Sequence, residues 1–368
     1  MVRDIGALKG LVMKVGQMAS YLPGALPDEA QRILAQLQSE SVAMTYDRVA
    51  EVIRAELGAA PESLFDDFEE KPFAAASIGQ VHRARFKGEA VAVKVQYPGI
   101  EDALRSDLST IGFMTKMSVL GLPVDGGALV EELRERIIEE CDYALEAKNQ
   151  AELGAFMRVP RVVAERSARR VLTTELASGM RFAEFVATAS QAAKNRAGEI
   201  IFRTSFDCLF RHAVYNGDPH PGNYLFDDDG EVTFLDFGCV RRFEPGFMAR
   251  WKAFARGVLD DDRKSFPDHF RGLGMVGREK GFDFDAQWEI TQYLYRPFLQ
   301  RNPFMTYTDD YVRESYGVLL FDNKNQRHCA MPAEWLLLNR LQWGMNAVLA
   351  KLNATAPWPD HFAAAVRS

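Results

Sequence analysis

The chain has 368 residues, 47% hydrophobic and 26% charged, which is the balance of a globular protein large enough for two domains or one fold with two lobes. Its net charge is −7 and it has no long Lys/Arg stripe, so nucleic acid is not an expected partner. No apolar run approaches the roughly 18 residues that span a bilayer, and the four cysteines lie far apart without metal-ligand spacing, as is typical of a cytoplasmic protein with reduced cysteines.

Residues 1 to about 70 are predicted to be helical. Asp28 and Gln31 form a capping-box pattern at the start of one helix. A second helix is predicted from Thr45 to Gly58, because apolar residues recur on one face between these positions and glycine favours the end of a helix.

The pattern then changes to strands. The stretches "IGQVHRARF" and "EAVAVKVQY" are joined by Lys87-Gly88 and predict a hairpin. Helical periodicity returns over 101–118 and 127–153, and "RRVLTTEL" predicts a further strand. From about residue 180 helices prevail, interrupted by a hairpin in "NYLFDDDGEVTFLDF" with Asp229-Gly230 at its turn.

This order of elements predicts an α+β, bilobal, protein-kinase-like fold with a cleft between a small β-rich lobe and a larger helical lobe. The expected domains are an N-terminal helical extension over 1–70, a kinase-like N-lobe over 71–177 and a mainly helical C-lobe over 178–368.

The stretch "PFAAASIGQV" is the first candidate for binding a nucleotide. Ala74, Ala76, Gly79 and Val81 occupy the G-x-G-x-x-G-x-V spacing of a loop that covers phosphates, and Ser77 lies within that loop. The alanine methyl groups restrict φ and limit how closely the backbone can approach a phosphate. We therefore expect a nucleotide loop with altered selectivity.

Lys94 lies one hairpin after this loop, in the V-A-I-K arrangement in which lysine reaches the α- and β-phosphates. A buried lysine needs a carboxylate partner. The helix expected over 127–153 offers four: Glu139, Glu140, Asp142 and Glu146. Residues spaced by four predict its buried stripe, namely Leu133, Ile137, Cys141 and Leu145. Periodicity alone leaves open which carboxylate faces the lysine.

The stretch "NGDPHPGNYLFDDDGEVTFLDFG" is the most specific one for phosphoryl transfer. Asp218 and Asn223 have the D-x-x-x-x-N spacing of a kinase catalytic loop, and Asp236 opens an Asp-Phe-Gly sequence. Asp218 can orient or deprotonate a hydroxyl, while Asn223 and Asp236 offer hard oxygen ligands to Mg²⁺. For His220, contact with a phosphate and bracing of the loop stay equally open.

The sequence after Asp236 runs directly into a predicted helix, without a long activation segment or an Ala-Pro-Glu motif. A protein substrate would have no obvious platform, which favours a small molecule, a lipid or the protein's own cargo as the acceptor.

Four stretches together resemble the UbiB/ADCK family of atypical protein-kinase-like proteins, which support ubiquinone biosynthesis. They are "LKGLVMKVGQMAS", "AAASIGQVH", "ECDYALEAKN" and "NGDPHPGN…LDFG", and they cover residues 8–238 in order. The resemblance implies binding of ATP and Mg²⁺, an ATPase or a small-molecule or lipid kinase, and a quinone-precursor or lipid ligand.

The resemblance also implies roles for single residues. Lys94 would pair with Glu146, and the K-x-G-Q lysine, Lys14, would pair with the E-x-D element of Glu140 and Asp142. The K-x-G-Q helix, Lys14 to Gln17, would pack at the cleft and regulate access to it. The nucleotide-binding set would extend to Glu175, near the end of the "RRVLTTEL" strand, and to Ala177, which follows it.

Two questions stay open at this stage. Residues 8–26 could lie on a membrane surface, which would make the protein peripheral at the inner face of a membrane. They could instead pack on the kinase fold, which is the interpretation we favour.

The alternatives to an ATPase or kinase are a non-catalytic, ATP-gated scaffold of a biosynthetic complex and an aminoglycoside- or choline-type phosphotransferase. Phosphotransferases of the aminoglycoside or choline type lack the K-x-G-Q motif that this chain has at Lys14 to Gln17.

Overall fold

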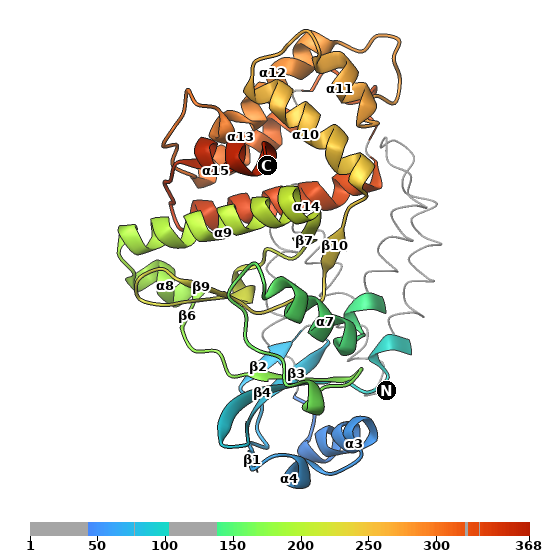
Figure 1. Ribbon diagram of the computed structural model, residues 1–368, viewed down its shortest axis with the longest axis vertical. Helices are drawn as coiled ribbons and strands as arrows, with labels where there is room; N and C mark the ends of the chain where they lie inside the picture. Colours follow the sequence, from blue (N-terminus) through green and yellow to red (C-terminus); the bar gives the residue numbers. More distant parts are fainter. Residues whose placement is uncertain (1–42, 77, 103–137, 321–322, 331) are drawn as a thin grey trace. The chain divides into compact units, whose positions relative to one another are not determined.

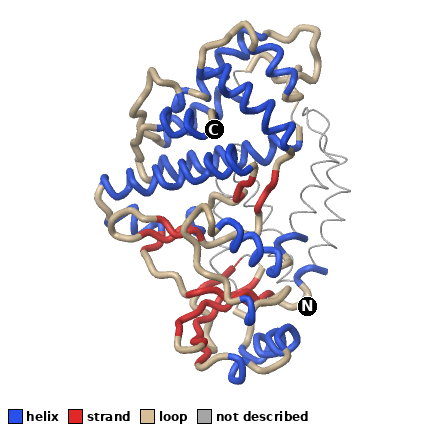
Figure 2. The backbone as a smooth tube through the Cα atoms, in the orientation of Figure 1, coloured by secondary structure: helices blue, strands red, loops and turns tan. Residues whose placement is uncertain are grey.

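The computed structural model describes residues 43–76, 78–102, 138–320, 323–330 and 332–368. They fall into two compact units (Figure 1). The first comprises the described residues up to Ser178 together with Leu235–Cys239, and the second comprises Gly179–Phe234 and the described residues from Val240 onward. The strands of the five-stranded sheet belong to the first unit, while helices make up most of the second (Figure 2).

The sheet of the first unit is built on the predicted hairpin. Strands β3 (Gly79–Phe86) and β4 (Glu89–Gln96) pair antiparallel, and Lys87 and Gly88 turn between them with φ of 52° and 80°. Strand β5 (Val171–Glu175) pairs with β4. Two short strands, β1 (Asp67–Phe68) and β2 (Ala74–Ala76), pair with β3.

The two faces of this sheet pack against different helices. Alternate β4 residues, Val91, Val93 and Val95, share one core with α3 (Tyr46–Leu57). The opposite face is covered by Tyr143, the first residue of α7 (Tyr143–Leu153). Helix α3 has the predicted limits, since Gly58 ends it in the left-handed region.

Residues 43–70 therefore share the core of the sheet. They supply α3, α4 (Pro61–Leu64) and β1, all in the first compact unit. The boundary expected at residue 70 falls inside this unit, whereas the boundary expected after residue 177 lies beside the change of unit after Ser178. The capping box at Asp28 and the helix expected over 101–118 lie outside the described residues, apart from Glu101 and Asp102.

The second unit begins with β6 (Met180–Arg181), α8 (Phe182–Thr188) and the long helix α9 (Gln191–His212). Strand β7 (Val214–Asn216) and η2 (Pro221–Asn223) follow, then the predicted hairpin of β8 (Tyr224–Phe226) and β9 (Val232–Phe234), with Gly230 at φ 88° in its turn. Strand β10 (Val240–Arg242) pairs with β7 and leads directly into α10 (Pro245–Leu259), as the absence of a long activation segment predicted.

The remaining elements of the second unit are helical: α11 (Phe266–Gly272), α12 (Phe284–Leu294), η3 (Arg296–Phe298), α13 (Asp309–Leu320), α14 (Ala333–Lys351) and α15 (Trp358–Val366). Aromatic side chains form their core. Phe202 and Phe206 of α9 pack on Phe298, and Phe298 stacks on Phe362 at 4.1 Å between ring centroids. Trp335 and Trp343 of α14 are buried as well.

Candidate nucleotide site

The sheet register gathers the predicted nucleotide residues on one face. Ala74 lies directly opposite Val81, Val81 opposite Lys94, and Lys94 opposite Leu172, so the four side chains form a row across β2, β3, β4 and β5. A second row holds Ala76, Gly79 and Gln96. Since side chains alternate along a strand, both alanines of the loop lie on the same face as the lysine.

Lys94 and Glu146 form the pair that the resemblance implies. The Nζ of Lys94 lies 2.8 Å from Oε1 and 2.9 Å from Oε2 of Glu146, and 3.9 Å from Oδ2 of Asp236. The three side chains are 16%, 4% and 34% exposed, respectively. The lysine thus sits between a buried carboxylate and a half-buried one, a suitable setting for a cation that contacts phosphates.

The surroundings of Lys94 keep it charged. Burial alone would lower its pKa, but the carboxylates of Glu146 and Asp236 outweigh burial, so the pKa of Lys94 lies above its ordinary value. Burial raises the pKa of Glu146, and the charge of Lys94 opposes that shift. The Lys94 Nζ also lies 4.7 Å from the centroid of the Tyr143 ring, a cation–π contact that fixes the ammonium group further.

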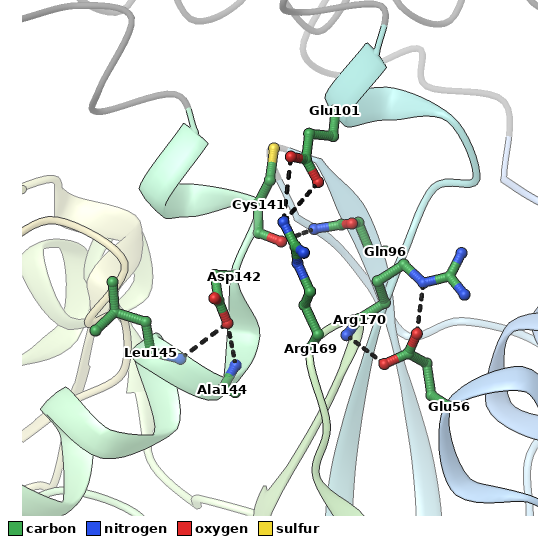
Figure 3. A network of polar contacts seen from close by, with 9 residues as sticks. All are labelled: Glu56, Gln96, Glu101, Cys141, Asp142, Ala144, Leu145, Arg169 and Arg170. Carbon is green, nitrogen blue, oxygen red and sulfur yellow. Dashed lines mark hydrogen bonds and ion pairs between the residues drawn. The ribbon is translucent and has the colours of Figure 1, made fainter.

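The helix expected over 127–153 is interrupted at Cys141 and Asp142, so that prediction is wrong for its described part. The new helix α7 begins with Asp142 as its N-cap, whose Oδ1 accepts hydrogen bonds from the backbone N–H groups of Ala144 and Leu145 (Figure 3).

The interruption changes which residues of α7 are buried. Cys141 is buried as predicted, but Leu145 is only half-buried, because the helix beyond the break starts in a new phase. Glu146, Asn149 and Gln150 form the buried face instead. This new phase brings Glu146, rather than a neighbouring carboxylate, to Lys94.

Gln96 fixes the segment where the helix is interrupted. It lies two residues beyond Lys94 on the same face of β4, and its Nε2 donates to the carbonyl oxygen of Cys141 at 3.0 Å (Figure 3). The backbone N–H of Tyr143 donates to the carbonyl of Arg169 at 2.8 Å. Arg169 in turn holds the carboxylate of Glu101 through Nη2 at 3.0 and 3.2 Å. Strand β4 therefore positions both ends of the Cys141–Glu146 segment.

The Asp-Phe-Gly segment belongs to the same unit as Lys94. Phe237 is fully buried, and its carbonyl accepts a hydrogen bond from Nδ2 of Asn149, one turn beyond Glu146 on α7. The backbone N–H of Gly238 donates to Oδ1 of Asp236 at 3.0 Å. A Cβ at Gly238 would lie 3.4 Å from that oxygen and 3.5 Å from Cγ of Glu140, so this E-x-D glutamate lies next to the segment.

Asp218 and Asn223 lie in the second unit, in a loop that is closed by its own hydrogen bonds. Asn223 donates through Nδ2 to the backbone oxygen of Asp218 at 2.9 Å and to its Oδ2 at 3.0 Å. The Nδ1 of His220 accepts from the backbone N–H of Gly222 at 3.0 Å, which supports the bracing role. The structure therefore brings Asp218 and Asn223 together.

The alanine stretch is a strand rather than an open loop. Ala74–Ala76 pair with Gly79–Val81, and Ser77 lies outside the described residues. Gly79 is required by packing, because a Cβ there would lie 2.3 Å from the carbonyl oxygen of Val95 and 2.8 Å from the Tyr143 hydroxyl. Close packing against Val95 and Tyr143 is therefore enough to explain why this position is glycine, whether or not a phosphate also approaches it.

The other predicted residues are placed as follows. Glu175 ends β5, and its carboxylate accepts from the backbone N–H and from Nε of Arg161, so its backbone is the part that could face a nucleotide. Ala177 follows two residues later and is half-buried. Lys14 and Gln17 lie outside the described residues. Their expected pairing with Glu140 and Asp142 stays a prediction.

Two polar residues that complete the site were missed by sequence reasoning. Gln96 binds the carbonyl of Cys141 before α7, and Asn149 binds the carbonyl of Phe237. One signal was available: Asn149 lies three residues after Glu146, on the same face of a helix. The strand pattern did not predict that Gln96 is buried.

Each compact unit presents an oxygen of the kind that Mg²⁺ binds. In the second unit, the amide nitrogen of Asn223 is engaged by Asp218, so its Oδ1 is the atom that can face a cation. In the first unit, Asp236 has a half-buried carboxylate. Among the residues that the structure describes, no group of three or more His, Cys, Asp or Glu side chains could hold a metal ion.

Comparisons with known proteins give consistent results. A model of the ABC1 atypical kinase-like domain matches residues 36–269. The chain is 31% identical over 375 residues to "Atypical kinase COQ8B, mitochondrial" of Rattus norvegicus, covering 98% of this chain and 70% of that protein. It is 30% identical to "Atypical kinase COQ8, mitochondrial" of Saccharomyces cerevisiae, over 95% of this chain and 72% of that protein.

A solved structure is similar over nearly the whole chain. The structure described as "The complex structure of Rv3197-erythromycin from Mycobacterium tuberculosis" has a TM-score of 0.73 and 29% identity, over 98% of this chain and 93% of that one. Together with the domain match, this likeness confirms the α+β, kinase-like fold. Within the described part of the chain, no helix has both the length and the apolar character needed to cross a bilayer.

Proposed function

Because the chain belongs to the ABC1 atypical kinase-like family, we propose that it binds ATP with Mg²⁺ and acts as an ATPase or as a kinase of a small molecule or lipid. The observation that carries this proposal is the buried Lys94–Glu146 pair beside Asp236. A lysine held by two hydrogen bonds to one carboxylate, next to an Asp-Phe-Gly aspartate, is the arrangement that phosphoryl-transfer enzymes use.

Each residue has a distinct role in this proposal. Lys94 contacts the α- and β-phosphates while Glu146 holds it in place. Asp236 and Asn223 supply oxygen ligands to Mg²⁺, which neutralises phosphate charge when bound. Asp218 orients a hydroxyl or water and accepts its proton. Ala74, Ala76, Gly79, Val81, Glu175 and Ala177 line the nucleotide, and Ser77 is assigned to the same set.

The acceptor is proposed to be small. Strand β10 leads from the Asp-Phe-Gly sequence directly into α10, which leaves few residues for a peptide platform. The relatives from rat and yeast are mitochondrial atypical kinases. The family resemblance favours a role in ubiquinone biosynthesis, with a quinone precursor or lipid as ligand and peripheral contact with a membrane and a biosynthetic complex. The erythromycin in the mycobacterial structure makes bulky small molecules a second class to screen.

The alternative function is an ATP-gated scaffold that binds nucleotide without turning it over. A direct test measures ATP hydrolysis by the purified chain with Mg²⁺, with and without anionic liposomes and quinone-like phenols. Turnover stimulated by liposomes or phenols supports the enzyme. Tight binding of ATP without turnover under every condition supports the scaffold, and rapid phosphorylation of an antibiotic or amino alcohol supports the phosphotransferase.

A further inference from the structure

Gly344 lies in the middle of α14, where its missing side chain makes room for the loop that carries Asp218 and Asn223. A Cβ at Gly344 would lie 2.4 Å from Cγ of Pro219 and 3.4 Å from its Cβ and Cδ. Glycine is a poor residue for a helix interior, so its presence there needs a reason. We propose that Gly344 is a positioning residue, which sets the height of the catalytic loop above α14.

Pro219 cannot turn aside to accept a larger neighbour. Its ring is closed on the backbone nitrogen, which fixes φ and leaves no side-chain rotation. Pro219 is buried, and it also restricts Asp218, the residue before it, to extended conformations. A methyl group at position 344 would therefore displace the backbone of the loop rather than a side chain.

Hydrogen bonds among its own polar groups hold the loop together. The carbonyl of Asp218 accepts from the backbone N–H of His220 at 2.8 Å and from Nδ2 of Asn223 at 2.9 Å. The backbone N–H of Asn223 donates to the carbonyl of His220 at 2.9 Å. A displacement at Pro219 is thus passed to both Asp218 and Asn223.

Helix α14 cannot easily retreat from the loop. Met345 and Leu349 are fully buried, and the Trp343 ring stacks on Tyr316 at 3.9 Å between centroids. Near the end of α14 the chain meets α9 at a second glycine, because a Cβ at Gly198 would lie 2.6 Å from that of Ala354 and 3.2 Å from Cδ2 of Leu349 (Figure 1). Interiors packed this closely resist an added methyl group.

Gly344 lies beyond residues 36–269, which the family model matches. The inference therefore assigns a task to the C-terminal part of the chain: α14 is the support on which the catalytic loop rests. It rests on the proposed roles of Asp218 and Asn223.

The experiment compares Gly344→Ala, Pro219→Ala and the double variant Gly344→Ala/Pro219→Ala in the full chain. Gly317→Ala is the matched control, because it makes the same change inside α13 where nothing lies within 4 Å of the new methyl group. Thermal unfolding and the kcat and KM for Mg-ATP hydrolysis are measured for all four variants and the wild type.

The expected results are specific. Gly317→Ala raises the Tm, since alanine favours a helix. Gly344→Ala lowers the Tm and lowers kcat roughly tenfold to a hundredfold, while the KM for ATP is unchanged, because the loop is displaced but the Lys94 half of the site is not. With Pro219→Ala already present, Gly344→Ala no longer lowers the Tm, since Cγ of the proline is gone.

The positioning role is overturned if Gly344→Ala behaves like Gly317→Ala. It is also overturned if Gly344→Ala lowers the Tm equally with and without Pro219→Ala. If the wild type hydrolyses no ATP, the proposed function fails instead, and the Tm values of the double-variant set still decide whether Gly344 holds the loop.

Discussion

Lys94 is the residue on which the candidate site depends, since it binds Glu146 through two hydrogen bonds and lies within 3.9 Å of Asp236. Such a pair costs solvation free energy, and one partner left alone costs far more. The Lys94–Glu146 pair can therefore be tested by measuring the free energy of unfolding as well as ATP hydrolysis.

Glu146→Gln is predicted to lower the free energy of unfolding by about 3 kcal/mol, because it leaves the buried Lys94 with only the more distant carboxylate of Asp236 as counter-charge. The double variant Lys94→Met/Glu146→Leu should recover most of this loss, since it removes both charges of the pair. It should not bind nucleotide, because the lysine proposed to contact the phosphates is gone. Chemical denaturation of the three proteins measures the effect. Equal destabilisation of the single and double variants would contradict a buried ion pair.

Ala76→Gly is predicted to change nucleotide affinity or the preference between ATP and ADP, because Ala76 lies on the Lys94 face of the sheet. The control is Ala75→Gly, which makes the same change on the opposite face of the same strand. Titration with both nucleotides measures the effect. Identical affinities for the two variants and the wild type would mean that the alanine methyl groups do not tune this site.

Single site residues could be predicted from the sequence where the chemistry of one residue requires a particular partner. A buried strand lysine needs a carboxylate, and the family motif identified Glu146. The role of Tyr143 could not be predicted in this way. In the sequence it is only an aromatic residue in an acidic stretch, whereas in the structure its ring packs on Lys94 and its hydroxyl lies next to Gly79. Such contacts depend on how α7 packs on the sheet, which periodicity does not contain.

Helix α7 shows how an element gives a site its geometry. The N-cap at Asp142 starts the helix anew, and the new phase buries Glu146, Asn149 and Gln150. The acidic stretch predicted a helix but not its interruption, because the sequence alone does not show whether Asp142 is a surface residue within a helix or the N-cap of a new one. The strand pairing was predictable, since Lys87-Gly88 and Asp229-Gly230 each select a tight hairpin.

Asp142→Ala is predicted to destabilise the protein by about 1 kcal/mol, because two N–H groups of α7 lose their acceptor. Asp142→Asn keeps an oxygen in the cap and should retain nearly wild-type stability. If Asp142→Asn nevertheless changes ATP turnover, the charge of Asp142 has a second role, as the E-x-D motif implies. Equal stability losses for Ala and Asn would contradict the capping role.

Strand β3 carries a pH-sensitive network on the α3 face of the sheet. Nδ1 of His82 lies 2.9 Å from the carbonyl oxygen of Glu69, and Nε2 lies 2.9 Å from Nε2 of Gln80. Oε1 of Gln80 accepts from the backbone N–H of Met44. Gln80 therefore presents its donor to His82, and His82 must be neutral with its proton on Nδ1.

The pH dependence follows from this arrangement. Burial lowers the pKa of His82, so the unfolded chain binds a proton more readily than the folded chain. The free energy of unfolding should fall as the pH drops through the unfolded value of about 6.5, and the loss should end once the pH is below the folded value. His82→Gln should weaken this dependence, whereas His212→Gln, at an exposed position, should retain it. An unchanged slope in His82→Gln would contradict the neutral network.

At the scale of the whole molecule, the residues assigned to nucleotide handling come from both compact units. Lys94, Glu146 and Asp236 belong to the first, and Asp218 and Asn223 to the second. The expected lobes separated Lys94 and Glu146 from Asp218 and Asn223 in the same way, but they placed Asp236 in the C-lobe over 178–368. That the segment belongs to the first unit was not predictable from sequence, since it depends on the burial of Phe237 and its hydrogen bond from Asn149.

The most direct test of the central claim is Mg²⁺-dependent ATP binding and hydrolysis by Asp236→Asn, with Asp228→Asn, an exposed aspartate in the preceding hairpin, as the control. Asp236→Asn keeps the shape of the side chain but removes the charge that we propose holds the cation. We predict that it abolishes both Mg²⁺-dependent binding and hydrolysis, while the control retains them. Binding and hydrolysis of Mg-ATP by Asp236→Asn at wild-type levels would contradict the proposed site.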